Sequence, residues 1–467
     1  MKVVLINPRS KNPDEIQQKC FPPVDLMYLA SALLGQSYEV EIIDANALRL
    51  RHSDVADMVK RSAPELVGVS LLSEILLPTY RLIKSIKSVY PASEIVIGGP
   101  HASALPTRVL EEFQEADYVI QGEGEDSIVA LCMALENRMG LSQVKGLFYR
   151  RDNKVVSNKP VTPIGNLDAL PRPARNLLRN VYVAKRYHII LVKQRPVDSI
   201  VTSRGCPFRC RFCCNIAQAY RARSPHNVME EIVSRYEEGI RNFDIADSNF
   251  TFDKERALAI FNLIKKERLK ISFRIKSRSD SIDEELVKKA KEAGAYLISL
   301  GMESGSQKIL DRMSKGTTVE TGVRACDIVM KAGLKLNTGW IVGFPGETPE
   351  TLEQTVTLIT KIKPTTANLN ILVPYPGTDV YKEAKENGTL VGEWSVENSF
   401  IPWVKLPWIK SYSHLETVAR KARSRVYYRP HYMMSFTKEI LCNFNGALAC
   451  YAFQEARKTL SRLPRRI

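Results

Sequence analysis

Residues 203–215 read Ser203-Arg-Gly-Cys-Pro-Phe-Arg-Cys-Arg-Phe-Cys-Cys-Asn215 and contain three cysteines, Cys206, Cys210 and Cys213, spaced C-x3-C-x2-C. The run follows a β-rich stretch, which predicts a loop able to bring three thiolates to one metal centre. A closed zinc site would need a fourth cysteine or histidine at a matching spacing, and none lies nearby. An iron–sulfur cube held by three thiolates instead keeps one iron open for another molecule.

This triplet, with the aromatic Phe212 just before its third cysteine, resembles the cluster motif of the radical S-adenosylmethionine (SAM) enzymes. The resemblance implies a 4Fe–4S cluster on the three cysteines, with SAM bound to the open iron through its amino and carboxylate groups. It also implies a low-potential electron donor, such as flavodoxin or ferredoxin, because the reduced cluster cleaves SAM to a 5′-deoxyadenosyl radical. Cys214 adjoins Cys213, which makes it a poor further ligand to the same cube.

Length and composition limit the remaining possibilities. A chain of 467 residues is expected to form two or three domains. No apolar run approaches the ~20 residues that span a bilayer, and Met1–Pro8 reads as a first strand, not a signal peptide. We expect a reducing, cytoplasmic setting, because the remaining cysteines give no disulfide framework: Cys20, Cys132, Cys326, Cys442 and Cys450.

The first ~140 residues alternate strand and helix patterns with short links between them. The expected helices lie at 22–35, 77–90 and 127–136. The expected strands lie at 2–8, 39–45, 66–72, 94–98 and 118–121. Such βα units imply an open parallel sheet of flavodoxin-like or Rossmann-like order, with ligand loops at the carboxyl ends of the strands.

Small and polar residues fill the five loops at those strand ends. Glycine and small side chains there let a flat, bulky ligand approach the backbone. The candidate cofactor contacts are Asn7, Ser10, Asp44, Ser70, Ser73, Gly98, Gly99, His101, Gly122, Glu123, Gly124 and Glu125.

These loops, upstream of the cysteine triplet, resemble the cobalamin-binding domain of the cobalamin-dependent radical SAM family, whose members carry similar Gly-Gly-x-His and Gly-Glu-Gly-Glu stretches. The resemblance implies that residues 1–140 bind cobalamin. Cobalamin mutases and methionine synthases carry Asp-x-His-x-x-Gly after the first strand, and that histidine binds cobalt. The corresponding loop here has no histidine. We therefore expect no protein imidazole on cobalt, and we expect His101 to line the pocket or cap its own loop.

A second βα series follows a connector at 141–195, in which short strands are expected at 145–150 and 154–157. Within 196–385 the expected strands are 199–203, 242–247, 271–276, 296–300, 335–342 and 367–373. The helices between them are 228–238, 254–266, 284–293, 319–332 and 349–362. Six units predict a partial (β/α)6 TIM-like barrel, whose active site belongs at the carboxyl ends of its strands. The cysteine loop follows the first of these strands.

The other barrel strand ends also resemble the radical SAM pattern. Each of these residues has an ordinary alternative as a βα-turn residue, since Pro-Gly-Glu before a helix is also a good helix start. The SAM contacts implied by the resemblance are Asp247, Asn249, Arg278, Glu303, Gly339 and Gly343.

The tail, residues 386–467, is expected to be mostly helical and is strongly basic. The whole chain has a formal net charge of +16, and residues 401–467 hold 13 lysines and arginines against three glutamates. The tail's tryptophans, tyrosines and methionines favour an apolar substrate or an anionic membrane surface over nucleic acid. Apolar residues recur at helical spacing over Glu439–Arg457, as in an interfacial helix. A solvated basic cap is the alternative.

The resemblance favours methylation of an unactivated carbon of a lipid, pigment or natural product, with cobalamin as the source of the methyl group. Ring-forming or oxidative members of the same family, in pigment or hopanoid pathways, are the main alternative. A tRNA methylthiotransferase would need three further cysteines in the first domain, where only Cys20 and Cys132 occur. The intact triplet argues against a cobalamin sensor without chemistry. The substrate stays open.

Overall fold

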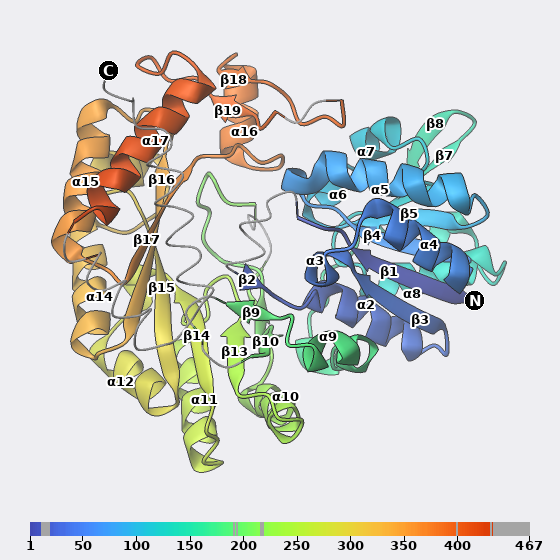
Figure 1. Cartoon of the computed structure of the whole chain (residues 1–467), viewed down its shortest axis with the longest axis horizontal. Helices are drawn as coiled ribbons and strands as arrows, with labels where there is room; N and C mark the ends of the chain where they lie inside the picture. Colours follow the sequence, from blue (N-terminus) through green and yellow to red (C-terminus); the bar gives the residue numbers. More distant parts are fainter. Residues whose placement is uncertain are drawn as a thin grey trace, which may run out of the picture.

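The computed structural model describes residues 1–10, 19–189, 192, 195–214, 219–397, 400–429 and 432. Figure 1 shows two α/β units side by side, with the orange and red C-terminal elements packed on the second unit. The predicted interfacial helix over 439–457 lies outside the described residues, as do Cys442 and Cys450. None of the described helices is both long and apolar enough to cross a bilayer.

The first unit is built on a parallel sheet whose strand order confirms the flavodoxin-like prediction. The order of the sheet is β3-β1-β4-β5-β6-β7-β8, and its first five strands are parallel. Those strands are β1 (Lys2–Asn7), β3 (Glu39–Asp44), β4 (Leu66–Ser70), β5 (Glu94–Gly98) and β6 (Tyr118–Ile120).

Both faces of this sheet are covered by helices. Along β1, Val3 and Leu5 belong to one hydrophobic core, whereas Val4 and Ile6 belong to another on the opposite face. A strand buried on both faces reads as an unbroken apolar run, which is why this strand shows no alternation. The covering helices are α2 (Val24–Leu34), α3 (Ala45–Leu48), α4 (His52–Ser62), α5 (Leu76–Val89), α6 (Pro100–Ala104), α7 (Pro106–Glu112) and α8 (Glu125–Leu135).

The two strands expected in the connector extend this sheet. β7 (Leu147–Arg151) pairs antiparallel with β6, and β8 (Lys154–Ser157) pairs antiparallel with β7. The first sheet therefore continues to residue 157. Further along the connector, α9 (Arg179–Val183) precedes β9 (His188–Ile189), which pairs with β2 (Lys19–Cys20).

The second unit is an open barrel of six parallel strands, as predicted. They follow one another in chain order as β10 (Val197–Ile200), β13 (Asn242–Ile245), β14 (Ser272–Ser277), β15 (Ala295–Glu303), β16 (Lys335–Val342) and β17 (Thr366–Ile371). The five outer helices are α10 (Pro225–Glu237), α11 (Lys254–Lys266), α12 (Glu284–Glu292), α14 (Val319–Lys331) and α15 (Pro349–Ile362). Each begins at a side chain that caps its first turn: Ser224, Asp253, Asp283, Thr318 and Thr348.

Side chains alternate across the barrel strands. In β16, Leu336 and Trp340 lie in the core shared with the helices, so Asn337 lies on the opposite, concave face. There Asn337 accepts hydrogen bonds from Thr366 Oγ1 at 2.7 Å and from Asn368 Nδ2 at 3.1 Å. At Asn337 the concave face is therefore polar, whereas the outer face beside it is apolar.

The last described helix, α17 (Tyr412–Tyr427), packs against β17, the strand at one free edge of the barrel. Two short strands, β18 (Leu390–Val391) and β19 (Trp403–Val404), follow α16 (Asp379–Glu386) and precede α17. On the edge strand β17, the hydroxyl of Tyr427 accepts from the Ala367 amide at 3.1 Å and donates to the Ala367 carbonyl at 2.6 Å.

A buried ion network joins the connector to the first barrel strand. Asp198 of β10 is fully buried and lies 2.8 Å from Arg175 Nε. Arg235 Nε donates to it at 2.7 Å, and the Tyr182 hydroxyl donates at 2.6 Å. Burial alone would raise the pKa of Asp198, but the two arginines hold that pKa below its usual range.

Candidate active site

The cysteine loop leaves the barrel at a short two-stranded ladder. β11 (Ser203–Arg204) pairs antiparallel with β12 (Arg221–Ala222), and the three predicted ligands lie on the loop between them. Cys210 is buried, Cys206 and Cys213 are partly buried, and Cys214 is exposed. The Cys213 amide donates to the Cys210 carbonyl at 3.0 Å, which makes a tight turn between two of the predicted ligands.

Asp247, a predicted SAM contact at the end of β13, is directed at the start of this loop. Its Oδ1 accepts from the amides of Thr202 and Ser203 at 2.7 and 3.1 Å. Its Oδ2 accepts from both of their hydroxyls, at 2.5 and 2.7 Å. The carboxylate is buried, and these four bonds give it a positioning role at the start of the cysteine loop.

Two cations lie beside Cys210. Arg278 Nη1 is 3.7 Å from the Cys210 sulfur, and its guanidinium lies over the Phe208 ring at 3.6 Å. Burial raises the pKa of the Cys210 thiol, while Lys315 and Arg278 oppose that rise. Positive charge at this position favours thiolates and an anionic ligand beside them.

Lys315 connects two further predicted contacts. It donates to Glu303 Oε1 at 2.9 Å, and its ammonium lies 6.0 Å from the centre of the Phe212 ring. A Cβ on Gly301 would lie 2.4 Å from Glu303 Oε1, so the glycine makes room for this ion pair. Sequence reasoning missed Lys315, which lies beyond α13 (Gln307–Arg312) in a loop with no motif.

Asn249 lies buried at the same end of the barrel. Its Oδ1 accepts from the Arg278 amide at 3.3 Å, and the side chain is buried. Its Nδ2 has no hydrogen-bond partner among the described residues. A buried donor without a partner costs free energy unless a ligand accepts from it, so this amide fits a cofactor contact.

The two glycines predicted near adenine differ in their surroundings. A Cβ on Gly339 would meet only the Leu300 carbonyl, at 4.0 Å, so the space beside Gly339 is open. Gly343 has a φ of +89° and packs against Leu415 of α17. Its amide donates at 2.6 Å to Glu347, and burial raises the pKa of this carboxyl to about 7. Gly339 fits a ligand contact, whereas Gly343 fits a structural turn.

Three polar candidates in the first unit are bonded within the protein. Asp44 is buried, caps α3, and accepts from Asn7 Nδ2 and from the Tyr187 hydroxyl, each at 2.9 Å. The Ser10 amide donates to Asn46 Oδ1 at 3.0 Å. These bonds hold the loops after β1 and β3 together.

His101 is buried beneath the loop that follows β5. Its Nδ1 lies 2.8 Å from the Ser73 hydroxyl, and its ring packs edge-on against Trp394. Burial lowers the pKa of His101 to about 4, and Arg108 adds to this shift. The imidazole is therefore neutral and packed within its own loop. Ser70, in the same region, donates to Asp25 at 3.3 Å.

The adjacent glycines Gly98 and Gly99 have different surroundings. A Cβ on Gly98 would meet nothing within 4 Å. Gly99 has a φ of +99°, and a Cβ there would lie 2.9 Å from the Leu71 amide nitrogen. Gly99 thus permits the turn, while Gly98 leaves a bare backbone facing open space, as a bulky ligand would need.

The Gly-Glu-Gly-Glu loop contacts the second unit. Glu123 receives two hydrogen bonds from Arg221, and Glu125 receives one from Arg204. Neither arginine was predicted as a site residue. The loop nevertheless brings the carboxyl edge of the first sheet against the base of the cysteine loop of the barrel. Gly122 has a φ of +89°, and Gly124 precedes α8.

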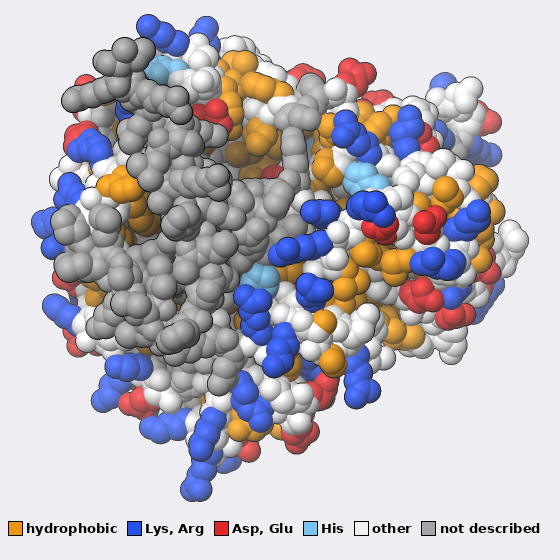
Figure 2. Space-filling model, viewed as in Figure 1, with side chains coloured by type: hydrophobic (Ala, Val, Ile, Leu, Met, Phe, Trp, Pro, Cys, Tyr) orange, Lys and Arg blue, Asp and Glu red, His pale blue; other side chains and the backbone are white. Residues whose placement is uncertain are grey.

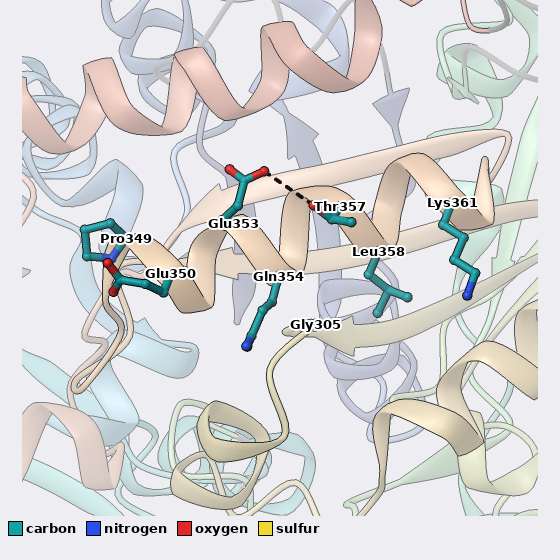
Figure 3. Close-up of a pocket in the computed structure, with 8 residues that line it drawn as sticks. All are labelled: Gly305, Pro349, Glu350, Glu353, Gln354, Thr357, Leu358 and Lys361. Atoms are coloured by element: carbon teal, nitrogen blue, oxygen red, sulfur yellow. Dashed lines mark hydrogen bonds between the residues drawn. The ribbon is translucent and has the colours of Figure 1, made fainter.

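Two cavities lie away from this junction. One, of about 630 Å³, is lined by Gly305 and by the outward side chains of α15, as Figure 3 shows, so it lies on the helical side of the barrel. The other, of about 120 Å³, lies between the first unit and the connector and includes Arg49, Lys185, Arg186 and Arg195. Figure 2 shows lysine and arginine side chains gathered where the two units meet.

Comparison with known proteins identifies the family. Residues 200–359 match the radical SAM superfamily, and residues 18–132 match the B12 binding domain. An uncharacterised methyltransferase of Pyrococcus horikoshii is 33% identical over 437 residues, which cover 92% of this chain and 93% of that protein. The chain belongs to the cobalamin-dependent radical SAM enzymes.

Relatives within this family carry out more than one reaction. The anaerobic magnesium-protoporphyrin IX monomethyl ester cyclase of Rubrivivax gelatinosus is 29% identical, covering 82% of this chain and 70% of its own. Cytidylyl-2-hydroxyethylphosphonate methyltransferase of Streptomyces wedmorensis is 27% identical, covering 85% and 84%. The radical SAM methyltransferase TsrM of Kitasatospora setae, solved with cobalamin and a [4Fe-4S] cluster, shares the fold with a TM-score of 0.75 at 19% identity, covering 92% and 89%.

The family's cofactors are SAM, a 4Fe–4S cluster and cobalamin, and the residues present fit them. Three features support the fit: a Cys210 thiol beside two cations, an amide donor with no partner among the described residues, and an open glycine backbone. Within the described ranges, no three histidine, cysteine or carboxylate side chains are already gathered as a metal site. Binding of the cluster by Cys206, Cys210 and Cys213 is therefore still a prediction, which mutagenesis can test.

Proposed function

We propose that this enzyme methylates an unactivated carbon of a small molecule. The observation that carries this proposal is the contact between the two ligand-binding edges: the cobalamin-domain loop at 122–125 bonds directly to the base of the cysteine loop. A methyl donor held on the first edge and a radical generated on the second would then act in one shared space. The relatives that are named methyltransferases support the same outcome.

When bound, the cluster and SAM supply a hydrogen-abstracting radical, and cobalamin supplies the methyl group. The chain's own residues position these groups. Arg278 and Lys315 place positive charge beside Cys210, where a carboxylate of SAM would be stabilised. Asn249 offers a donor without a partner in the described part of the chain, at the same strand ends. Gly98 leaves room for a corrin against the backbone.

The concave face of the barrel is the surface we assign to the substrate. It presents Asn337 and the exposed Asn368 and Asn370, and alternation in β14 places Lys276 on the same face. Of the tail aromatics that favoured an apolar substrate, Trp403 and Tyr432 are buried in the core, and Trp408 and Tyr427 pack against it. Residues 433–467 lie outside the described residues. We therefore place a polar or anionic group of the substrate against this face.

Lys276→Met tests that assignment. The variant should raise the KM for the substrate about tenfold or more, since a hydrogen bond to a charged group contributes about 1.5–3 kcal/mol. SAM cleavage without substrate should stay unchanged. An unchanged KM would remove Lys276 from the binding surface.

The direct test of the reaction is product analysis with SAM that carries a deuterated methyl group. The reconstituted enzyme and a cell extract are incubated without oxygen, and the small molecules are compared with those from a Cys206→Ala control. A product that gains the labelled methyl group supports the proposal. The cyclase alternative, favoured by the 29% identity to a cyclase, predicts loss of hydrogen from a substrate without gain of the label.

The state of cobalt is a separate proposal. Since His101 is buried against Ser73 and Trp394, we propose that no protein imidazole binds the metal. Electron paramagnetic resonance of the cob(II)alamin form should show no axial nitrogen splitting. A protein-derived splitting that disappears in His101→Ala would overturn this.

Three further expectations accompany the proposed function. A flavodoxin or ferredoxin supplies the electron, and the oxygen-sensitive cluster favours a reducing cytoplasm. The basic tail contacts an anionic membrane surface, where each lysine or arginine contributes about 1 kcal/mol. Co-sedimentation with anionic liposomes at low and high salt tests the contact. Equally poor binding by the whole chain and by a variant ending at residue 400 would leave the tail as a structural cap.

A further inference from the structure

The carboxylates of the Gly-Glu-Gly-Glu stretch (122–125) contact the base of the cysteine loop. Arg221 donates to both oxygens of Glu123, at 2.9 and 2.7 Å, and Arg204 donates to Glu125 at 2.5 Å. The four side chains are 7–16% exposed. These are close, largely desolvated, charge-assisted hydrogen bonds, a class stronger than surface ion pairs.

The two arginines need these partners because they lie opposite each other. Arg204 and Arg221 are register partners in the β11–β12 ladder, and like charges directly opposite destabilise a strand pair. The ladder has only two residue pairs, so its own backbone bonds provide little support. Without carboxylates, repulsion between the guanidinium groups would open the base of the loop that carries the cysteines.

A third segment completes the contact. The Ile164 amide in the connector donates to Glu123 Oε2 at 2.7 Å, and Arg221 donates to the Ile164 carbonyl at 2.6 Å. Glu123, Arg221 and Ile164 thus form a closed ring of hydrogen bonds across three parts of the chain. On the other side, the Arg204 guanidinium lies over the Tyr28 ring at 5.1 Å.

We propose that Glu123 and Glu125 are positioning residues that hold the cysteine loop at a fixed distance from the glycine loops of the first sheet. They act through Arg221 and Arg204, and not as direct cofactor contacts. The proposal rests on the proposed function for the identity of the two cofactor sites. Its tests need neither substrate nor turnover, so a failed methyl transfer assay and a failed test here are distinguishable.

The first test compares amide hydrogen exchange in the wild type and in the Glu123→Gln/Glu125→Gln double variant, both without cofactors. Exchange at 203–204 and 221–222 should rise about tenfold or more, while β14–β16 stay as protected as in the wild type. Glu353→Gln is the matched control, since Glu353 also binds an arginine, Arg425, through both oxygens but on the exposed surface. Unchanged exchange at the ladder, or a rise throughout the chain, would overturn the proposal.

The second test measures the electron paramagnetic resonance spectrum of the iron–sulfur cluster. Reconstituted to equal iron content, the double variant should show an altered electron paramagnetic resonance spectrum of the reduced cluster on adding SAM, whereas Glu353→Gln should match the wild type. An unaltered spectrum would overturn the positioning role. If the double variant does not fold, the same measurement is made on the Glu125→Gln single variant.

Discussion

The ligand-binding edges of the two sheets face each other but differ in the chemical groups that they present. At the edge of the first sheet, the polar side chains after β1 and β3 are bonded within the protein, and the open feature is the bare backbone at Gly98. At the edge of the barrel, a buried thiol lies beside two cations, and a buried amide donor has no partner in the described chain.

This difference indicates which kind of ligand each edge can bind. A bare backbone beside bonded polar groups suits a large ligand that is recognised by shape and by contact with main-chain atoms. Cations beside thiols suit an anionic cluster and a ligand with a carboxylate. One fold class, the parallel α/β sheet, thus provides two chemically distinct surfaces within a single chain.

The largest expected effect concerns the three cysteines at the edge of the barrel. Replacing Cys206, Cys210 and Cys213 together with alanine should abolish the broad visible absorption of the reconstituted cluster, because its thiolate ligands are gone. Cys214→Ala should retain it. A full cluster in the triple variant would show that the barrel edge is not the metal site.

The next largest effect concerns the buried ion network around Asp198, compared with an exposed ion pair. Asp198→Asn removes the carboxylate that Arg175 and Arg235 share; Arg175 keeps the buried Glu231, but Arg235 is left with the exposed Glu238. The free energy of unfolding should fall by about 3–5 kcal/mol. Glu353→Gln, which removes an exposed partner of Arg425, should cost only about 0–1 kcal/mol. Urea denaturation of the cofactor-free protein measures both. Similar costs would mean that the buried network contributes no more than a surface pair.

A smaller effect probes His101 in the first unit. Its folded-state pKa of about 4 lies below the unfolded value of about 6.5. The unfolded chain therefore binds the extra proton between these values, so the histidine's contribution is complete above pH 6.5 and is lost as pH falls toward 4. The loss should reach about 3 kcal/mol. Denaturation series for the wild type and His101→Gln should diverge over that range, and parallel curves would contradict the burial of a neutral ring.

The smallest effect separates the two glycines. Gly99→Ala forces a side chain onto a positive φ and against Leu71, at a cost of about 1–3 kcal/mol in stability. Gly98→Ala should leave stability within about 0.5 kcal/mol but weaken cobalamin binding, measured by titration of the protein with the cofactor. Unchanged affinity in Gly98→Ala would mean that this backbone does not face the corrin.

Much of this fold could be predicted from local patterns. Strands β5 and β16 begin and end at the expected residues, as do helices α11 and α15. Periodicity and capping residues determine these elements, and both are local properties of the sequence. The cysteine spacing is local too, which is why it identified the candidate metal site.

The missed features depend on residues far apart in the chain. Arg204 lies 79 positions from Glu125, and Arg221 lies 98 positions from Glu123, so no local pattern could connect them. The same holds for Lys315 beside Cys210. Likewise, the resemblance that assigned Asp247 to SAM could not show that its buried carboxylate also accepts hydrogen bonds from Thr202 and Ser203.

The Tyr427 contact at the edge strand has a consequence for the protein in a crowded cell. An open barrel ends in a strand whose amides and carbonyls can recruit a strand from another molecule. By occupying both backbone groups of Ala367, one phenol takes the place of the missing neighbour strand. At Ala367, therefore, the β17 edge offers no free backbone group to a strand from another molecule.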